Sequence, residues 1–372
     1  MPIRSEWTLA REGVTLDTFT RLVQLTALNP ALTLPLVLLA RYTARGSLLA
    51  SQNDTTFKSL KTLLALGLVG TASKWLDRKV LNNWKGNKRG EWDWNKEVVV
   101  VTGGSDGIGK IIVQLFAEKG VKVGVLDVQE LTYEAPPTVH FFKCDLADPQ
   151  SIAAAAASLK STIGDPTVLI NNAGLARGKH ILSATEFDIR LTFNVNTLSH
   201  YFLAQQFLPH MIARNHGQIV TVASQAAYVT APKMVDYAAS KAAALAFHEG
   251  LSAELSQVYN APGVRTIIMA QGYTRTKLFE GFEGPGLFPE TVAEEIVKAV
   301  LRGESAHLTL PVHGWPIIAG MRLLPGWIQY GVRKRLVSVM GGWKGRQVVQ
   351  PTEVGGTKEG GVEESTVLVD AN

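Results

Sequence analysis

Residues 98–109 read Val-Val-Val-Val-Thr-Gly-Gly-Ser-Asp-Gly-Ile-Gly, and they are the most informative part of the chain for predicting its architecture. The β-branched residues at its start predict a short buried strand, and the apolar residues after Gly109 indicate a helix. The glycines between them permit a tight turn in which the backbone can approach a pyrophosphate, whose charge is stabilised by the helix N-terminus. The stretch therefore predicts a dinucleotide site within an α/β domain.

Outward from this turn, strand and helix signals alternate along the chain. Apolar runs predict strands at 98–101, 121–126, 139–142, 167–170, 219–223 and 265–269. Longer stretches predict helices at 109–118, 151–163, 191–213 and 237–257. Alternation of this kind, with strands that are continuous apolar runs, is typical of a parallel sheet covered by helices on both faces.

Polar residues follow several of the predicted strands. Asp127 ends the second strand, about twenty residues beyond the glycines, where a carboxylate can accept hydrogen bonds from the adenosine ribose. Asp145 and Leu146 follow the third strand, and Asn-Asn-Ala-Gly at 171–174 follows the fourth. Since the carboxyl ends of parallel strands line one crevice, these residues are candidates for ligand contacts. A 2′-phosphate would face the carboxylates of Asp106 and Asp127, so NAD is favoured and NADP is the alternative.

Tyr237 and Lys241 lie four residues apart at the start of a predicted helix, which puts them on one face. A free tyrosine has a pKa of about 10, and a nearby ammonium lowers that pKa toward the working range of a proton-transfer catalyst. Ser224 follows the strand predicted at 219–223, and its hydroxyl could hold a substrate oxygen. These three residues are the candidates for acid–base chemistry.

Taken together, the motifs resemble the short-chain dehydrogenases/reductases. They are Thr-Gly-x-x-x-Gly-Ile-Gly at 102–109, Asn-Asn-Ala-Gly at 171–174, Ser224, and Tyr-x-x-x-Lys at 237–241, in the family's order and spacing. Asn196 falls where that family has its fourth catalytic residue. The resemblance covers roughly residues 97–310 and implies a Rossmann-like, doubly wound parallel sheet.

The resemblance also implies hydride transfer at the nicotinamide C4, with Tyr237 passing a proton to or from the substrate oxygen. Lys241 would bind the nicotinamide ribose and lower the tyrosine pKa, Ser224 would orient the substrate, and Asn196 would hold a water in the proton relay. The residues implied to bind the cofactor are Thr102, Gly103, Ser105, Gly107, Ile108, Gly109, Asp127, Asp145, Leu146, Asn172, Ala173, Gly174, Tyr237, Lys241, Gly272, Thr274 and Thr276. The chain departs from the family at Gln271-Gly272, where Pro-Gly is usual.

Residues 1–96 differ in composition from the rest of the chain. They carry 14 Lys/Arg and 7 Asp/Glu, a net charge of +7, whereas the remainder is slightly acidic. Leu22–Ala40 is uncharged but contains Asn-Pro at 29–30 and Pro35, which is typical of a broken or interfacial helix. Tryptophans mixed with basic residues at 74–94 are typical of the membrane headgroup level. We expect a helical membrane-associating segment, with a soluble cap on the domain as the alternative.

The C-terminal third of the chain contains an apolar loop and an amphipathic extension. After Thr276, an apolar loop stands where the family has its substrate lid, which favours a lipophilic substrate. This loop contains Leu278, Phe279, Phe282, Leu287 and Phe288. Residues 311–344 form an amphipathic extension, and residues 345–372, rich in Gly and Glu, are expected to be disordered.

Together with the N-terminal segment, the extension resembles the membrane-associated retinol and 17β-hydroxysteroid dehydrogenase branch. That resemblance implies a retinoid, steroid or fatty alcohol as substrate. It also implies a location on the endoplasmic reticulum or lipid droplets, with the catalytic domain facing the cytosol.

An NAD-dependent dehydrogenase of a lipophilic alcohol is the leading hypothesis. An NADPH-dependent carbonyl reductase and a non-catalytic dinucleotide-binding membrane scaffold are the alternatives. Because the excess basic charge lies in the N-terminal segment, nucleic-acid binding by the catalytic part is not expected. The histidines form no H-E-x-x-H pattern, so no metal is expected, and the single Cys144 excludes an internal disulfide. A homodimer through the helices at 191–213 and 237–257 is implied by the family resemblance.

Overall fold

The computed structural model describes residues 3–4, 8–86, 91–282, 284–339 and 342–343. Within these ranges seven strands form one sheet in the order β3-β2-β1-β4-β5-β6-β7, and all neighbouring strands run parallel. The strands are β1 (Val98–Thr102), β2 (Lys122–Asp127), β3 (Val139–Lys143), β4 (Val168–Asn171), β5 (Gly217–Val222), β6 (Val264–Gln271) and β7 (Ala306–Leu310). The predicted Rossmann-like parallel sheet is confirmed.

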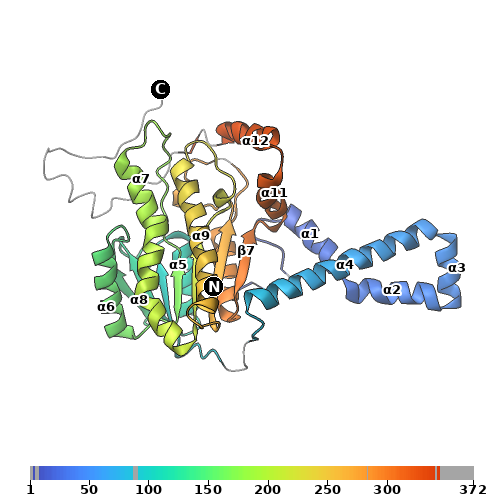
Figure 1. Cartoon of the computed structure of the whole chain (residues 1–372), viewed down its shortest axis with the longest axis horizontal. Helices are drawn as coiled ribbons and strands as arrows, with labels where there is room; N and C mark the ends of the chain where they lie inside the picture. Colours follow the sequence, from blue (N-terminus) through green and yellow to red (C-terminus); the bar gives the residue numbers. More distant parts are fainter. Residues whose placement is uncertain (1–2, 5–7, 87–90, 283, 340–341, 344–372) are drawn as a thin grey trace.

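Helices cover both faces of the sheet (Figure 1). One face packs on α5 (Gly107–Ala117) and α10 (Pro289–Leu301), and the other on α6 (Pro149–Ile163), α8 (Ser199–Arg214) and α9 (Val235–Gln257). Val98 and Val100 of β1 belong to the core on the α6 side, whereas Val99 and Val101 belong to the core on the α5 side. Because successive strand side chains point to opposite faces, a strand buried on both sides must be a continuous apolar run.

The strand order reverses at β1, which lies between β2 and β4. In open α/β sheets the crevice at such a switch point, outside the carboxyl ends of the strands, is where ligands bind. The glycine turn leaves β1 at this point, and α5 begins at Gly107 with Asp106 as its N-cap. The fold therefore brings the predicted dinucleotide site to the switch point.

The helix predicted at 191–213 is three elements instead of one. They are α7 (Glu186–Phe193), the five-residue π-helical segment η1 (Asn194–Leu198) and α8. The wider turn of η1 coincides with the inward-facing side chain of Asn196, which bonds to the backbone of Leu175 instead of to its own helix. Periodicity alone could not predict this break, because the apolar pattern continues through it.

The structure also contains three elements that the sequence patterns did not predict: α10, β7 and the short helical segment η2 (Gln225–Ala227) after β5. The helix α10 starts with Pro289 in its first turn, where proline is favoured because the missing N–H has no intrahelical partner there. Val292, Ile296 and Val300 of α10 pack against α5 in the core on that face.

The N-terminal segment is helical as predicted. It comprises α1 (Leu16–Leu25), α2 (Pro30–Tyr42), α3 (Ala44–Gln52) and α4 (Asp54–Leu81). Figure 1 shows α2, α3 and the adjoining part of α4 projecting from the sheet domain as an arm. Pro35 was expected to interrupt the helix and does not. The chain breaks at residues 26–29, where Asn29 caps α2 by accepting a hydrogen bond from Ala31 N at 3.0 Å.

No single helix in the described part of the chain is long and apolar enough to cross a membrane. The pair of α1 and α2, bent by 46° at the break, meets the length and composition criteria together. Many apolar side chains of the arm are exposed, among them Leu36, Leu39, Leu66 and Val69.

The base of the arm is attached to the β7 edge of the sheet. Arg78 of α4 donates two hydrogen bonds to Glu304, at 2.8 and 2.7 Å. Asn82 exchanges two hydrogen bonds with the backbone of Ser305, and Arg265 donates to Asn82 O at 3.0 Å. At the other end of the segment, the Asp17 carboxylate accepts hydrogen bonds from the backbone N–H groups of residues 312 and 313.

The C-terminal extension folds back over the carboxyl ends of the strands. It contains η4 (Val312–Gly314), α11 (Trp315–Gly320), η5 (Met321–Leu323) and α12 (Gly326–Val339). The tail predicted at 345–372 lies outside the described residues.

Candidate active site

The glycine turn is packed too closely for side chains at three of its positions, Gly103, Gly104 and Gly109. Gly103 has φ +65°, and a Cβ there would lie 2.8 Å from Ala173 Cα. A Cβ on Gly109 would lie 2.0 Å from Gly103 O. The turn is held to the next strand because Asn172 Nδ2 donates to Thr102 O and Gly103 O, at 3.0 and 3.2 Å. Two N–H groups, of Asn172 and Ala173, donate to the Thr102 hydroxyl at 3.0 Å each.

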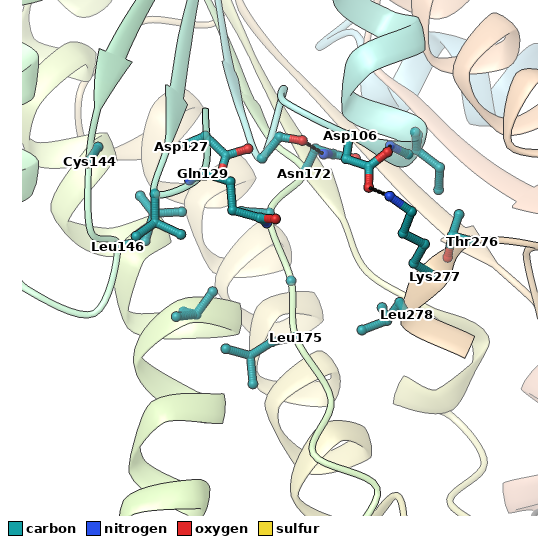
Figure 2. A pocket seen from close by; sticks show the side chains of 17 residues that line it. Asp106, Asp127, Gln129, Cys144, Leu146, Asn172, Leu175, Thr276, Lys277 and Leu278 are labelled. Atoms are coloured by element: carbon teal, nitrogen blue, oxygen red, sulfur yellow. Dashed lines mark hydrogen bonds and ion pairs between the residues drawn. The ribbon is translucent and has the colours of Figure 1, made fainter. Parts of the chain in front are cut away.

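A cavity of about 160 Å³ lies beside this turn (Figure 2). Residues predicted to bind the cofactor line it, namely Gly103, Gly107, Ile108, Asp127, Leu146, Asn172, Ala173, Gly174 and Thr276. The buried carboxylate of Asp127 accepts hydrogen bonds from Ser105 N at 2.9 Å and Gln129 N at 3.1 Å. Asp127 is therefore held rigidly at the end of β2, on the cavity wall.

These residues fit a dinucleotide. The turn presents backbone without Cβ atoms, α5 points its N-terminus at the cavity, and a carboxylate stands at the ribose position. A further polar atom beside the cavity could accept a hydrogen bond from a bound ligand: Asp145 Oδ2 is buried and accepts none from the described residues. Its neighbours Cys144 and Leu146 line the cavity.

A second cavity, of about 370 Å³, adjoins the first and contains the acid–base candidates. Ser224, Tyr237 and Lys241 line it together with Gly272, Thr274 and Thr276. The Ser224 hydroxyl is hydrogen-bonded to the Tyr237 hydroxyl, and it donates to Gln271 O at 3.3 Å. Lys241 Nζ donates to Val222 O at 2.8 Å and lies 5.9 Å from the centre of the Tyr237 ring.

The pKa of Tyr237 moves opposite to the direction expected from its neighbour Lys241. Burial raises the pKa of Tyr237 to about 12, and the hydrogen bond with Ser224 opposes that rise. Burial also lowers the pKa of Lys241 to about 8. Since both side chains are 3% exposed, the loss of hydration dominates for each and disfavours its charged form, although a lysine with a pKa of about 8 is still mostly protonated at pH 7.

Asn196 is fully buried and is bonded on both sides of its amide. Its Oδ1 accepts from Leu175 N at 2.8 Å, and its Nδ2 donates to Leu175 O and Ser240 Oγ at 2.9 Å each. A Cβ on Gly174 would lie 3.4 Å from both Asn196 Oδ1 and Lys241 Nζ. Asn196 therefore lies next to the lysine but does not line either cavity.

Four other predicted residues also support the cavities without lining them: Thr102, Ser105, Gly109 and Asp145. Conversely, Gln129 and Lys277 line the first cavity and Gln225 lines the second, although the motifs gave no signal for them. Each of these three follows a motif residue by one or two positions, so proximity in sequence was the available hint.

Apolar residues from separate segments form the remaining wall of the second cavity. They include Val229, Met234, Phe279, Phe282, Ile318, Met321, Val332 and Leu336. Of the loop residues expected to form a lid, Leu278, Phe279 and Phe282 line the cavity. Leu287 does not, because it is buried in the core beneath α10, and Phe288 lies under the guanidinium of Arg275, 4.6 Å from its ring centre.

Comparison with known proteins agrees with this geometry. The family model for short chain dehydrogenases matches residues 97–283. The chain belongs to the short-chain dehydrogenase family. A relative, dehydrogenase RED2 of Cochliobolus heterostrophus, is 44% identical over 216 residues, which cover 56% of this chain and 78% of the relative.

Two further relatives confirm the expected branch of the short-chain dehydrogenases. Estradiol 17-beta-dehydrogenase 11 of Pongo abelii is 33% identical, with 55% of this chain and 72% of the relative covered. Epidermal retinol dehydrogenase 2 of Mus musculus is 30% identical, with 74% and 91% covered. A solved short-chain dehydrogenase of Burkholderia cenocepacia, in complex with NADP, is 29% identical with a TM-score of 0.55, covering 65% of this chain and 98% of that one. The chain is thus an NAD(P)-dependent oxidoreductase that acts on CH–OH groups.

Proposed function

We propose that this short-chain dehydrogenase oxidises a lipophilic secondary or allylic alcohol, of the retinoid, steroid or fatty alcohol class, with NAD. The observation that carries the proposal is the second cavity, where Ser224 and Tyr237 face an apolar wall built from the 278–282 loop, α11 and α12. Apolar walls with a few converging polar groups select an apolar molecule and orient its one reacting oxygen. The names of the retinol and estradiol relatives support the same substrate class.

In the proposed mechanism the Tyr237 hydroxyl exchanges a proton with the substrate oxygen, and Ser224 holds that oxygen by a hydrogen bond. Lys241 would bind the nicotinamide ribose, and its ammonium would favour the phenolate of Tyr237 once the cavity is filled. Asn196 would keep the η1 segment open beside Lys241, where a relay water can sit. When bound, the nicotinamide ring supplies the hydride acceptor.

The preference for NAD is supported by two carboxylates on the wall of the first cavity. A 2′-phosphate would approach Asp127, whose position is fixed by two backbone hydrogen bonds, and Asp106 in the glycine turn. The Asp127 charge opposes an added phosphate dianion, whereas the Asp106 charge is partly offset by Lys277, whose Nζ lies 3.0 Å from Asp106 Oδ2. Dissociation constants for NADH and NADPH, measured with the same protein, test this preference; tighter binding of NADPH would refute it.

The burial of Tyr237 favours reduction of a carbonyl, which is the reaction of a second candidate, an NADPH-dependent carbonyl reductase. A Tyr237 pKa of about 12 keeps the phenol protonated at neutral pH, and the protonated form is the one that donates to a carbonyl oxygen. For alcohol oxidation the same pKa predicts a rate that rises with pH through the neutral and alkaline range. A rate of oxidation that does not change between pH 7 and pH 9 would mean that the pKa of Tyr237 is lowered below 7 when cofactor and substrate are bound.

The proposal extends to the location of the enzyme. We propose that residues 1–96 associate with the endoplasmic reticulum or lipid-droplet surface, while residues 97–310 form the catalytic domain on the cytosolic side and residues 311–344 form its amphipathic extension. The exposed apolar side chains of the arm and its basic composition support this arrangement. Fractionation of the full chain, and of a chain without residues 1–96, tests it.

A homodimer through α8 and α9 is part of the proposal. Tyr201 of α8 is exposed, as are Val258 and Tyr259, which directly follow α9, and a groove lined by residues from both helices runs between them. Large exposed apolar side chains on neighbouring helices are typical of protein interfaces. Molar mass in detergent, determined by light scattering for wild type and Tyr201→Asp, tests the interface.

The deciding experiment is NADH formation by detergent-solubilised protein over a panel of retinoid, steroid and long-chain alcohols. Wild type is compared with Tyr237→Phe and with Tyr201→Phe, a matched loss of one hydroxyl from a tyrosine that is 45% exposed. We expect Tyr237→Phe alone to lose activity, by about 10²-fold or more. Equal rates in all three proteins would refute the role of Tyr237, and cofactor binding without any turnover would favour the scaffold.

A further inference from the structure

An ion pair joins the two sides of the first cavity. Lys277 Nζ lies 3.0 Å from Asp106 Oδ2, and Figure 2 shows the lysine reaching across to the glycine turn. Asp106 belongs to the turn that follows β1, whereas Lys277 begins the short helical segment η3 (Lys277–Phe279) after β6. Both residues line the cavity in which the cofactor is proposed to bind.

The Asp106 carboxylate occupies a position that attracts anions. Its Oδ1 accepts a hydrogen bond from Gly107 N at 2.8 Å, at the N-terminus of α5, where the helix dipole stabilises negative charge. The pyrophosphate of a dinucleotide is stabilised by the same end of this helix in Rossmann-like folds. A cofactor phosphate and the Asp106 carboxylate therefore compete for one electropositive region.

The segment that carries Lys277 lies directly over the turn. A Cβ on Gly107 would be 3.8 Å from Thr276 Cγ2, so Thr276 faces the turn at Gly107 while Lys277 reaches Asp106 beside it. The Lys277 side chain is 63% exposed, which leaves its ammonium free to change partners. A cation in this position can neutralise either the carboxylate or a bound phosphate.

We propose that Lys277 is a cofactor-binding residue, whose ammonium pairs with Asp106 in the free protein and with the pyrophosphate in the complex. The proposal rests on the cofactor position given above. In the complex, Lys277 offsets the repulsion between the pyrophosphate and the Asp106 carboxylate, and it draws residues 276–279 over the cofactor. The same residues reach the second cavity, where Phe279 forms part of the substrate wall, so Lys277 lies on the segment that links the two cavities.

A purely structural role for Lys277 predicts different behaviour. If the lysine only neutralises Asp106, its loss should have no effect on ligand binding once Asp106 has become neutral. If the lysine contacts the phosphate, its loss should weaken binding in both backgrounds. The two roles therefore separate in a double-variant comparison.

The experiment measures the dissociation constant of ADP by calorimetry for wild type, Lys277→Gln, Asp106→Asn and the double variant. ADP carries the adenosine and pyrophosphate without the nicotinamide, so the readout does not depend on turnover. Asparagine caps helices about as well as aspartate, so Asp106→Asn keeps the start of α5. Lys96→Gln is the matched control, because Lys96 forms a surface ion pair with Asp93 at 2.9 Å and does not line the cavity.

We expect Lys277→Gln to raise the ADP dissociation constant about fivefold, the size expected of an exposed ion pair, and to do so again in the Asp106→Asn background. Asp106→Asn alone should lower the constant, and added salt should weaken ADP binding less in Lys277→Gln than in wild type. Lys96→Gln should bind like wild type.

An unchanged constant in Lys277→Gln, or an effect that vanishes in the Asp106→Asn background, would overturn the proposal. A wild-type protein that does not bind ADP would instead overturn the cofactor position itself. The two failures are therefore distinguishable in one set of titrations.

Discussion

Replacing Gly109 by alanine should destabilise the protein although the position is helical. A methyl group there would lie 2.0 Å from Gly103 O and 2.6 Å from Asn172 Nδ2, whereas real Cβ contacts stay above 3.0 Å. The turn would have to move by the difference, at least 1.0 Å. The turn cannot move freely, because Gly103 is itself closely packed: a Cβ on Gly103 would lie only 2.8 Å from Ala173 Cα.

The magnitude follows from opposing contributions. Alanine gains about 1 kcal/mol over glycine within a helix. Overpacking costs about 1–3 kcal/mol, and displacing the hydrogen bond from Asn172 to Gly103 O costs about 1 kcal/mol more. The net expected loss in the free energy of unfolding is about 1–3 kcal/mol. Since the displaced atoms form the dinucleotide cradle, NAD binding should weaken at least about tenfold.

Urea denaturation and calorimetric titration with NADH measure these two effects. Gly250→Ala is the control, because Gly250 lies within α9 and a Cβ there would meet no atom of the described residues within 4 Å. That variant should be stabilised by about 0.5–1 kcal/mol and should bind NADH normally. A Gly109→Ala protein as stable as Gly250→Ala, with unchanged NADH affinity, would refute the reasoning from close packing.

Three further predictions concern buried charge and the substrate wall. Lys241→Met should abolish activity yet stabilise the fold by about 2 kcal/mol at pH 7: the lysine pKa of about 8 in the fold, against about 10.4 when unfolded, corresponds to about 3 kcal/mol, and loss of the hydrogen bond to Val222 O takes away about 1 kcal/mol. In urea denaturation the gain should shrink as pH rises from 8 to 10.4, where the unfolded wild type binds the proton that the folded form has lost; a pH-independent gain would contradict this cause. Leu336→Ala should raise KM for long apolar alcohols about tenfold, because Leu336 lines the second cavity, while the exposed Val337→Ala should leave KM unchanged. Equal KM values for the two variants in steady-state assays would mean that α12 does not contact the substrate. Asp188→Asn should lower the free energy of unfolding by about 3 kcal/mol, because the buried Arg177 loses the carboxylate that accepts its Nε–H at 2.7 Å. A decrease of less than about 0.5 kcal/mol in urea denaturation would mean that the Arg177 guanidinium is hydrated in the fold.

The sheet and the cofactor side were predictable because their signals are local. β1, the glycine turn and Asp127 are close in sequence, and the two-sided burial of β1 appears directly as four consecutive valines. Tyr237 and Lys241 are likewise one helical turn apart. Each of these features could be predicted from a window of thirty residues or fewer.

The substrate side could not be predicted in the same way. Its wall joins Phe282, Met321 and Leu336, which lie on separate elements, and nothing in their own sequence windows marks them as neighbours. The break at Asn196 was hidden because apolar periodicity continues through η1. The pKa of Tyr237 depends on burial by the whole fold, so spacing from Lys241 predicted the wrong direction.

The joint between Asp17 and residues 312–313 affects how the enzyme can be prepared. Removing the N-terminal helices, a common route to a protein that needs no detergent, would also remove the acceptor of two backbone N–H groups at the start of the C-terminal extension. It would take away Arg11, which pairs with buried Glu294, and Asn82, which bonds to Ser305. The shortened protein would keep the residues of the dinucleotide site but lose the contacts that hold the start of the C-terminal extension. It would therefore bind the cofactor with normal affinity and its substrate with lower affinity. KM values measured with such a preparation would therefore reflect a loosened substrate wall and not the substrate affinity of the full chain.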